Sequence, residues 1–544
     1  MTRYQGDSLG SPAVMDNSFS SIKYGGRELL PTAMLSEPST VKRRRRIRPI
    51  WAALVLLLVI GAGIGLYFAI KGSSSSNTSA TSGDEITQEG LDSIGIGSAS
   101  GSGATVEQDE DDDEPGNPKA YPQSVCELPN YMSKNGHIVA VSSNGTEVPL
   151  KMKGINWFGM EASEAIPLGL WDNSINGTTV YNISAFLADN KFNSVRLPLM
   201  AQWILENKEP NRNLINEQTN RAINVTSYLT LLQGIVKALQ YRHIGVLLSM
   251  HTLTKTDKGD LWYNDENPES KFLESIDILT KNLCSSEYWN IMGLDLKNEP
   301  ANATWGDNGA TDFRVGAIRI ADRMLKGCPK WLGFVEGIYT EHTMILDGVN
   351  TTYFDWYGGG LQGARTNSVE FSVENKVVWA PHYYTPAVFP QTYFYGGGTQ
   401  GEEGTDGKGG LMGYVELDDQ ALRGRIKATI DDMFGYLANE TGPALVLGEF
   451  GGLYSNDLHP MKTTKRCTDF TIELIKRPGW AGGFVWSLNP ESEYQYNPAD
   501  KPGRFFEGIM QTDWLNADTE YHTGLAAIDD MKNLRPFPCF PLSV

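Results

Sequence analysis

Short apolar runs alternate with amphipathic stretches over residues 121–544 of the chain. A short apolar run bounded by Gly, Pro or Asn is typical of a buried strand, whereas apolar residues that recur every three to four positions are typical of a helix. Eight strand candidates follow a hairpin-like start at 137–150: 154–157, 194–199, 245–251, 293–299, 332–336, 377–382, 444–449 and 482–486.

Helical patterns lie between most of these strands, at 181–190, 225–241, 271–284, 418–438 and 464–476. Strands and helices that alternate in this way predict a parallel sheet covered by helices, and eight repeats are the number found in a (β/α)8 TIM barrel. The roughly 420 residues of this region suffice for one such domain with insertions. We therefore expect an α/β fold with a single barrel, whose functional residues lie at the C-terminal ends of the strands.

Two of the apolar runs lead into a glutamate. Glu299, which precedes a proline, closes the fourth run, and Glu449, which precedes Phe-Gly-Gly, closes the seventh. Hydrolysis of a glycosidic bond uses two carboxyl groups, one protonated to help the leaving oxygen depart and one ionised to attack or stabilise the sugar. Across a barrel mouth these two side chains would face each other. A gap of about 5 Å would favour retention of anomeric configuration and a gap of about 6.5–9.5 Å inversion, and the sequence leaves both open.

Other polar residues also fall at the strand ends. Arg196 lies inside an apolar strand, where an arginine needs a buried acid, and Glu449 is the natural partner. His251 ends the third strand, where it could line the cleft or be a hydrogen-bonded core histidine. Glu336 closes the fifth strand, and we do not include it among the site residues. Three more candidates complete the set at this end of the barrel: Asn298, His382 and Trp486.

An uncharged apolar stretch, Ile50–Ile70, lies near the N-terminus. Its 21 residues match the length that a helix needs to cross a bilayer. A basic run at 42–48 precedes it, whereas only Lys71 follows, and this bias predicts a single-pass type II protein with its remainder extracellular or in the secretory lumen. A cleaved signal would begin closer to the first residue and have a shorter apolar core. A nuclear signal would account for the basic run alone.

The residues that follow the apolar stretch fit this topology. All eight Asn-x-Ser/Thr sequons come after it: Asn77, Asn144, Asn176, Asn182, Asn224, Asn302, Asn350 and Asn439. An acidic run at 109–114 ends a Ser/Gly-rich segment, which favours a flexible spacer over a calcium site. Four parts are thus expected: a disordered cytoplasmic tail (1–48), a transmembrane helix (49–71), an acidic Ser/Gly-rich linker (72–120) and the barrel (121–544).

Charge and cysteine content limit the partners. The formal net charge of −19 argues against nucleic acid, because a field of this sign repels phosphates, whereas a neutral glycan is unaffected. Five cysteines follow the apolar stretch, and the odd number leaves at least one unpaired or bridging between chains. None has Cys-x-x-Cys spacing, so we expect no metal site. We also expect no cofactor, since a carboxyl acid and a carboxylate nucleophile suffice, and we expect a monomer.

Six segments of the chain occur in the order of one known family. They are Gly-Ile-Asn-Trp-Phe-Gly (154–159), Val-Arg-Leu-Pro (195–198), Asp-Leu-Lys-Asn-Glu-Pro (295–300), Pro-His-Tyr-Tyr (381–384), Leu-Gly-Glu-Phe-Gly (447–451) and Trp-Ser-Leu-Asn-Pro (486–490). On these segments the chain resembles glycoside hydrolase family 5, a family of retaining (β/α)8 glycosidases, and is most similar to its secreted endo-β-1,4-glucanases, the cellulases.

The resemblance implies a role for each candidate residue. Glu299 would be the general acid/base, and Glu449 the nucleophile that forms a glycosyl-enzyme ester. Arg196 and Tyr384 would hold Glu449 ionised and oriented. The remaining side chains would serve the substrate or the polar network: Asn298 at the sugar 2-hydroxyl, His251 along the cleft, His382 in the network and Trp486 as the floor under the sugar.

The hypothesis is therefore a membrane-anchored, outward-facing retaining endoglucanase that acts on β-1,4-glucan in polysaccharide catabolism or cell-wall remodelling. The loops at 340–374 and 396–413 border the expected barrel mouth, so a β-1,3-glucanase or a β-mannanase with the same mechanism stays an alternative. A catalytically silent carbohydrate receptor is an alternative of a different class. A glycan on Asn302, three residues after Glu299, would crowd the cleft.

Overall fold

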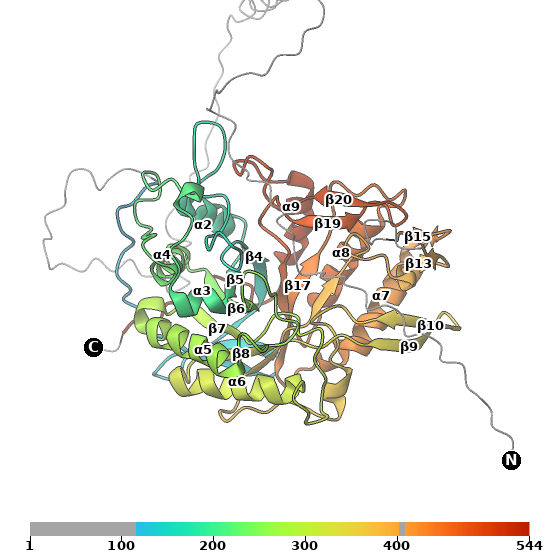
Figure 1. The fold of residues 1–544 in the computed structure, drawn as a ribbon, viewed down its shortest axis with the longest axis horizontal. Coiled ribbons are helices and arrows are strands. Elements are labelled where there is room, and N and C mark those ends of the chain that lie inside the picture. Colours follow the sequence, from blue (N-terminus) through green and yellow to red (C-terminus); the bar gives the residue numbers. More distant parts are fainter. Residues whose placement is uncertain (1–115, 402–408, 543–544) are drawn as a thin grey trace, which may run out of the picture. The chain divides into compact units, whose positions relative to one another are not determined.

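The computed structural model describes residues 116–401 and 409–542 (Figure 1). The predicted membrane helix at 49–71, the tail before it and nearly all of the linker after it lie outside these residues. Within the two described ranges, no helix is both long enough and apolar enough to span a bilayer.

Eight strand positions close a parallel barrel, which confirms the predicted architecture. β18 pairs with β4 to close the ring, and the sixth position is shared by two short strands, β11 and β12, that both pair with β17. In chain order the barrel strands are β4 (Met152–Asn156), β5 (Ser194–Met200), β6 (Gly245–Thr252), β7 (Ile291–Asp295), β8 (Leu332–Val335), β11 (Val377–Trp379), β12 (His382–Tyr384), β17 (Ala444–Gly451) and β18 (Trp480–Val485).

Eight α-helices of the described residues follow or connect the strands: α2 (Val180–Asp189), α3 (Ala201–Glu206), α4 (Tyr228–Tyr241), α5 (Glu269–Leu283), α6 (Phe313–Gly327), α7 (Asp419–Met433), α8 (Thr463–Ile475) and α9 (Thr519–Leu525). Side-chain oxygens of Thr179, Ser227, Asp312 and Asp418 accept backbone N–H bonds at helix starts, as N-cap residues do. Helix α6 was not predicted, and α7 ends five residues before the end of the helix predicted at 418–438.

Short 3-10 helices complete the helical structure: η3 (Arg212–Leu214), η4 (Ser286–Tyr288), η5 (Gln362–Arg365), η6 (Thr392–Phe394), η7 (Gly435–Leu437) and η8 (Ala526–Ile528).

An antiparallel meander lies against the end of the barrel where the strands begin. It consists of β1 (Asn130–Lys134), β2 (His137–Val141) and β3 (Glu147–Leu150). Backbone N–H groups of β1 donate to the carbonyls of Lys330 and Asn375, each two residues before the start of β8 or β11. The opposite end, where the strands finish, is thereby left for the candidate site.

Insertions follow several strands on the side where the strands end. The predicted loop at 340–374 contains a hairpin, β9 (Glu341–Leu346) and β10 (Val349–Phe354), which lies beside α7 in Figure 1. An ion pair of 2.7 Å between Arg425 of α7 and Asp347 of the hairpin turn joins the two. Further short pairs are β13 (Tyr395–Gly396) with β16 (Val415–Glu416), β14 (Thr399–Gln400) with β15 (Leu411–Met412), and β19 (Glu493–Tyr496) with β20 (Pro502–Phe506).

Four of the five cysteines form two disulfides. Cys126–Cys539 joins the beginning and the end of the described domain, and Cys284–Cys328 joins the C-terminal caps of α5 and α6. Cys467 is buried and unpaired, as the odd number of cysteines predicted.

Candidate active site

Arg196 is the centre of a buried charge network inside the barrel. It extends from β5 and is fully buried, where it donates to Asp295 Oδ2 through Nε (3.0 Å) and Nη2 (2.6 Å). Its Nη1 donates to Glu449 Oε1 at 2.5 Å, and its Nη2 lies 3.3 Å from Glu336 Oε1. Burial alone would lower the pKa of the guanidinium, but Asp295, Glu449 and Glu336 raise it well above its ordinary value. The arginine therefore carries a fixed positive charge among three carboxyl groups.

Glu449 lies in β17 with both of its carboxyl oxygens bound. Arg196 donates to Oε1, and the hydroxyl of Tyr384 donates to Oε2. Burial raises the pKa of Glu449, while the charges of His382 and Arg196 oppose that rise. The carboxylate is thus held in one orientation by a cation on one oxygen and a phenol on the other.

Glu299 lies four residues beyond the end of β7, at a backbone φ of 46°. This left-handed conformation is uncommon for a residue with a Cβ atom and is frequent at functional sites. Its N–H donates to Glu336 Oε2 at 2.8 Å, and its Oε1 lies 2.9 Å from His382 Nδ1. Oε2 has no hydrogen-bond partner among the described residues.

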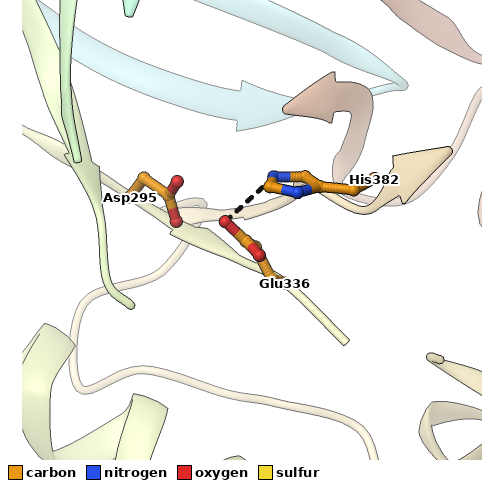
Figure 2. A group of neighbouring side chains, drawn as sticks. All are labelled: Asp295, Glu336 and His382. Carbon is orange, nitrogen blue, oxygen red and sulfur yellow. Dashed lines mark ion pairs between the residues drawn. The ribbon is translucent and has the colours of Figure 1, made fainter. Parts of the chain in front are cut away.

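His382 connects the two glutamates. Nδ1 lies 2.9 Å from Glu299 Oε1 and 3.7 Å from Glu449 Oε2, while Nε2 lies 3.1 Å from Glu336 Oε1 (Figure 2). Burial alone would lower the pKa of this imidazole, but Glu336, Glu449 and Glu299 raise it well above its usual range. One carboxyl oxygen of Glu299, one ring nitrogen of His382 and one carboxyl oxygen of Glu449 all lie within 4.8 Å of one another. The structure therefore brings together the two carboxyl groups that were predicted to face each other.

The remaining predicted residues surround this centre. Asn298 Oδ1 accepts from Arg196 Nη2 at 2.9 Å, which leaves the amide NH2 for another partner. The Trp486 ring is stacked on Phe158, with centroids 5.4 Å apart, and on His251, at 6.1 Å. Burial and the charge of Arg196 lower the pKa of His251 well below its usual value. His251 is therefore a neutral ring stacked against Trp486.

Three polar residues of the network are absent from the predicted site: Asp295 and Lys297, which were not considered, and Glu336, which was considered and left out. Asp295 is a carboxylate inside an apolar strand. Just as a buried arginine needs a buried acid, a buried carboxylate needs a buried partner of opposite charge. Lys297 donates to the carbonyl of His251 at 3.1 Å and to that of Asn298. Burial lowers the pKa of Lys297 to about 8. All three residues follow or end apolar runs, which is the signal that could have identified them.

Two groups of three side chains have ligand-type atoms close enough to hold a metal ion: Asp295, Glu336 and His382 (Figure 2), and Glu299, His382 and Glu449. A divalent cation in either group would lie next to the guanidinium of Arg196, which already pairs with Asp295, Glu336 and Glu449. Since Arg196 supplies the positive charge that these carboxyl groups need, we assign no metal here.

A family model described as Cellulase (glycosyl hydrolase family 5) matches residues 141–492, which include every residue of the site. Among curated proteins, the chain is similar to the major extracellular endoglucanase of Xanthomonas campestris pv. campestris, with 29% identity over 381 residues, 70% of this chain and 68% of that protein. It is also similar to an endoglucanase of Paenibacillus polymyxa, with 27% identity over 314 residues, 57% of this chain and 69% of that protein.

Solved structures of endoglucanases share the fold. An endocellulase from Pyrococcus horikoshii in complex with cellotetraose is 28% identical and superposes with a TM-score of 0.59, over 74% of this chain and 99% of that one. The catalytic domain of the major endoglucanase from Xanthomonas campestris pv. campestris is 27% identical with a TM-score of 0.56, over 73% of this chain and 99% of that one.

Proposed function

Since the chain belongs to glycosyl hydrolase family 5, the cellulase family, we propose that it is an endoglucanase that hydrolyses β-1,4-glucan with retention of anomeric configuration. The observation that carries the mechanism is the approach of Glu299 and Glu449, whose nearest ligand-type atoms lie within 4.8 Å. An approach of single oxygens this short fits the separation of about 5–5.5 Å between carboxyl groups in retaining enzymes better than the about 6.5–9.5 Å in inverting enzymes. The endoglucanase relatives and the cellotetraose-bound endocellulase support the choice of polymer.

In the first step, Glu449 attacks the anomeric carbon and Glu299 gives a proton to the departing glycosidic oxygen. Glu449 suits the attack because Arg196 and Tyr384 bind its two oxygens and fix their direction. Glu299 suits the proton transfer because its Oε2 is without a protein partner. The bond to the leaving sugar breaks, and a glycosyl ester on Glu449 forms.

In the second step, Glu299 acts as the base. It removes a proton from a water molecule that attacks the same anomeric carbon, and the ester bond to Glu449 breaks, which returns both carboxyl groups to their starting states. Asn298 presents its amide NH2 beside Glu299, in position for the sugar 2-hydroxyl, and Trp486 offers an apolar ring face to the sugar.

A β-1,3-glucan or a β-mannan would be cleaved by the same steps, and the hairpin and loops after β8 and η6 are the elements expected to choose between polymers. A silent carbohydrate receptor is disfavoured, because binding alone requires neither two opposed carboxyl groups nor the cation and phenol that orient one of them.

Release of reducing ends by the purified protein from carboxymethyl-cellulose, a β-1,3-glucan and a β-mannan tests the proposal. We expect activity on the cellulose derivative that is lost by at least about 10⁴-fold in Glu449→Gln and kept in Glu374→Gln, which changes an exposed carboxyl group outside the site. Activity on another polymer alone would correct the substrate, and activity that survives Glu449→Gln would refute the mechanism.

The stereochemistry has its own test. Proton NMR of the first products from a soluble cello-oligosaccharide distinguishes newly formed β-anomer from α-anomer before they equilibrate. We expect the β-anomer, as retention requires, and initial release of the α-anomer would show inversion.

We also propose that Ile50–Ile70 anchors the chain as a type II membrane protein with the barrel outside the cytosol. The basic run before this segment and the sequons after it support the proposal. In isolated membranes, we expect the chain to resist extraction at alkaline pH and its barrel to be protected from added protease until detergent is present. Extraction into the soluble fraction would refute the anchor.

A further inference from the structure

Glu336 ends the fifth barrel strand position and is enclosed by protein on all sides. Its side chain is fully buried, and the backbone of Gly358 closes over it so tightly that a Cβ atom there would lie 2.4 Å from Glu336 Oε2. Figure 2 shows the carboxyl group directed at His382 and toward Asp295. A group enclosed in this way acts on the reaction through its neighbours rather than on the sugar.

The first neighbour is the backbone of Glu299. Glu336 Oε2 accepts the N–H of Glu299 at 2.8 Å, at the residue whose φ is 46°. A left-handed residue with a Cβ atom persists only where surrounding contacts stabilise it. This hydrogen bond therefore helps to fix the backbone from which the acid/base side chain projects.

The second neighbour is His382. Nε2 lies 3.1 Å from Glu336 Oε1, at ion-pair distance, and has no aligned hydrogen bond with any described residue, Glu336 included, so Glu336 is the acid paired with this otherwise unpartnered nitrogen. The other nitrogen, Nδ1, lies 2.9 Å from Glu299 Oε1. A carboxyl group, an imidazole and a second carboxyl group thus form a chain from β8 through β12 to the loop after β7.

We propose that Glu336 is a positioning residue of the glycosidase reaction, which fixes the backbone of Glu299 and shares one proton with His382 so that Nδ1–H of His382 always donates to Glu299 Oε1. The proposal rests on the endoglucanase function proposed above. If the shared proton is on Nε2, the imidazole is cationic and both nitrogens donate; if it is on Glu336, the neutral imidazole accepts at Nε2 and still donates at Nδ1.

The two carboxyl oxygens of Glu299 then have different roles in the reaction. Oε1 accepts from His382 throughout, so Oε2 is the oxygen that gives the proton to the glycosidic oxygen and later takes one from water. No proton leaves Glu336 or His382 in either step, and the balance of the reaction is that of the two glutamates alone.

The surrounding charges keep the proton on the pair. Burial and the neighbouring carboxyl group of Asp295 raise the pKa of Glu336 to about 8, while His382 and Arg196 oppose that rise. Glu449 and Glu299 also face His382. The ammonium of Lys297, just beyond the end of β7, interacts with Glu336, and the ring of His251, near the end of β6, interacts with His382. Near neutral pH the Glu336–His382 pair therefore holds its proton.

Besides the N–H of Glu299 and Nε2 of His382, Glu336 contacts the guanidinium of Arg196 at 3.3 Å. Glu336→Gln separates the contact with the Glu299 backbone from the two contacts that depend on charge. Its amide oxygen can still accept the N–H of Glu299, but the side chain can no longer ionise or share a proton. We expect kcat on carboxymethyl-cellulose to fall about tenfold with KM changed less than about twofold. We also expect the basic limb of kcat/KM to change, because the ionisation of wild-type Glu336, whose pKa is raised to about 8, is absent from the variant. Glu336→Ala, which loses all three contacts, should be slower still.

Leaving-group dependence separates this role from a general weakening of the fold. The 4-methylumbelliferyl β-cellobioside needs the acid when its bond to the aglycone breaks, whereas the 2,4-dinitrophenyl β-cellobioside hardly does, because dinitrophenolate leaves without a proton. In Glu336→Gln we expect kcat/KM to fall about tenfold on the first substrate and by less than about threefold on the second. A merely structural role would lower both rates by the same factor.

Asp457→Asn is the matched control. Asp457 and His459 form another buried carboxyl–imidazole pair, at 2.8 Å, that has no contact with either catalytic glutamate. Asp457→Asn should leave the pH profile unchanged, and also the ratio of kcat/KM on the two cellobiosides. If Glu336→Gln does not fold, Glu336→Asp, which withdraws the carboxyl group from Glu299 and His382 by one methylene, should still lose more activity on the 4-methylumbelliferyl than on the 2,4-dinitrophenyl cellobioside.

A Glu336 variant with the wild-type pH profile, or with equal losses on both cellobiosides, would overturn the proposal. A wild-type protein that is inactive on every β-linked substrate would instead refute the proposed function on which this role depends, so the two failures are told apart.

Discussion

The guanidinium of Arg196 and the carboxylate of Glu449 meet inside the barrel, with Nη1 2.5 Å from Oε1 and both side chains buried. The same guanidinium binds Asp295 through Nε and Nη2, so its plane is fixed from two sides. A planar fork that binds two carboxyl groups cannot be replaced by a point charge. The contact with Glu449 therefore depends on arginine geometry as well as on positive charge.

We predict that Arg196→Lys lowers kcat by about a hundredfold or more, because one ammonium cannot reach both carboxyl groups with the same bonds. Burial raises the pKa of Glu449 and Arg196 opposes this, so a weaker contact lets the pKa rise further. Since the nucleophile must be ionised, the acid limb of kcat/KM should move to higher pH. Arg323→Lys, at an exposed pair with Asp277, is the control, and the prediction is wrong if both variants keep wild-type profiles.

Tyr384→Phe removes the hydroxyl that donates to Glu449 Oε2 and leaves the ring in place. We expect kcat to fall about 10- to 100-fold with a smaller change in KM, because the lost bond orients the nucleophile and does not bind substrate. The acid limb should again move to higher pH, since a hydrogen bond to the ionised form lowers the pKa of Glu449. Steady-state kinetics between pH 4 and 8 would show this, and a change confined to KM would contradict it.

The barrel could be predicted because its strands are buried on both faces and appear as continuous apolar runs. The resemblance to family 5 is confirmed by the family model. Helix α6 was missed although its buried positions recur every three to four residues from Phe313 to Leu325, so the signal for it is present in the sequence. The hairpin of β9 and β10 was taken as loop because its strands alternate exposed and half-buried positions and have little apolar content.

The site was predicted as a set of strand-end residues, and the structure brings them together around Arg196. The sequence does not show which polar residues from different strands contact one another in the folded barrel. Asp295 and Glu336 lie close to Arg196 only because β5, β6, β7 and β8 are successive neighbours in the closed barrel, so that side chains at their ends converge. Strand β7 ends at Asp295, four residues earlier than the apolar run indicated. At Glu299 the backbone N–H donates to the side chain of Glu336 and not to a neighbouring strand.

Lys297 ties the ends of β6 and β7 together through the carbonyls of His251 and Asn298. We predict that Lys297→Met leaves both buried carbonyls without this donor and lowers the free energy of unfolding by about 2 kcal/mol. Because Asn298 and Glu299 follow directly, kcat should also fall about tenfold. Denaturant titration and kinetics would measure the two effects. Lys326→Met, at an exposed position of α6, should change neither, and equal behaviour of the two variants would contradict the prediction.

The disulfide Cys284–Cys328 closes a segment of 44 residues between the ends of α5 and α6. Restricting the unfolded chain over such a loop is worth about 3–4 kcal/mol. We predict that the double variant Cys284→Ala/Cys328→Ala loses a free energy of unfolding of this size while its kcat stays within about twofold of wild type. Cys467→Ala removes a buried thiol without a bridge and should cost only about 1 kcal/mol. Equal losses in the two variants, measured by guanidinium unfolding, would show that this bridge does not stabilise the fold.

Trp486 is 8% exposed, and its ring is stacked on Phe158 and on His251, which hold it in place. We place the sugar against the part of the indole that stays exposed. We predict that Trp486→Ala raises KM for cello-oligosaccharides about tenfold or more, which corresponds to about 1.4 kcal/mol of lost binding. Trp486→Phe, which keeps an aromatic face, should raise it less than about threefold. Because the platform binds substrate and transition state alike, kcat should fall much less than kcat/KM. If Trp486→Ala instead lowered kcat and left KM unchanged, the result would contradict this prediction. The ring would then position the reacting groups and would not bind the sugar.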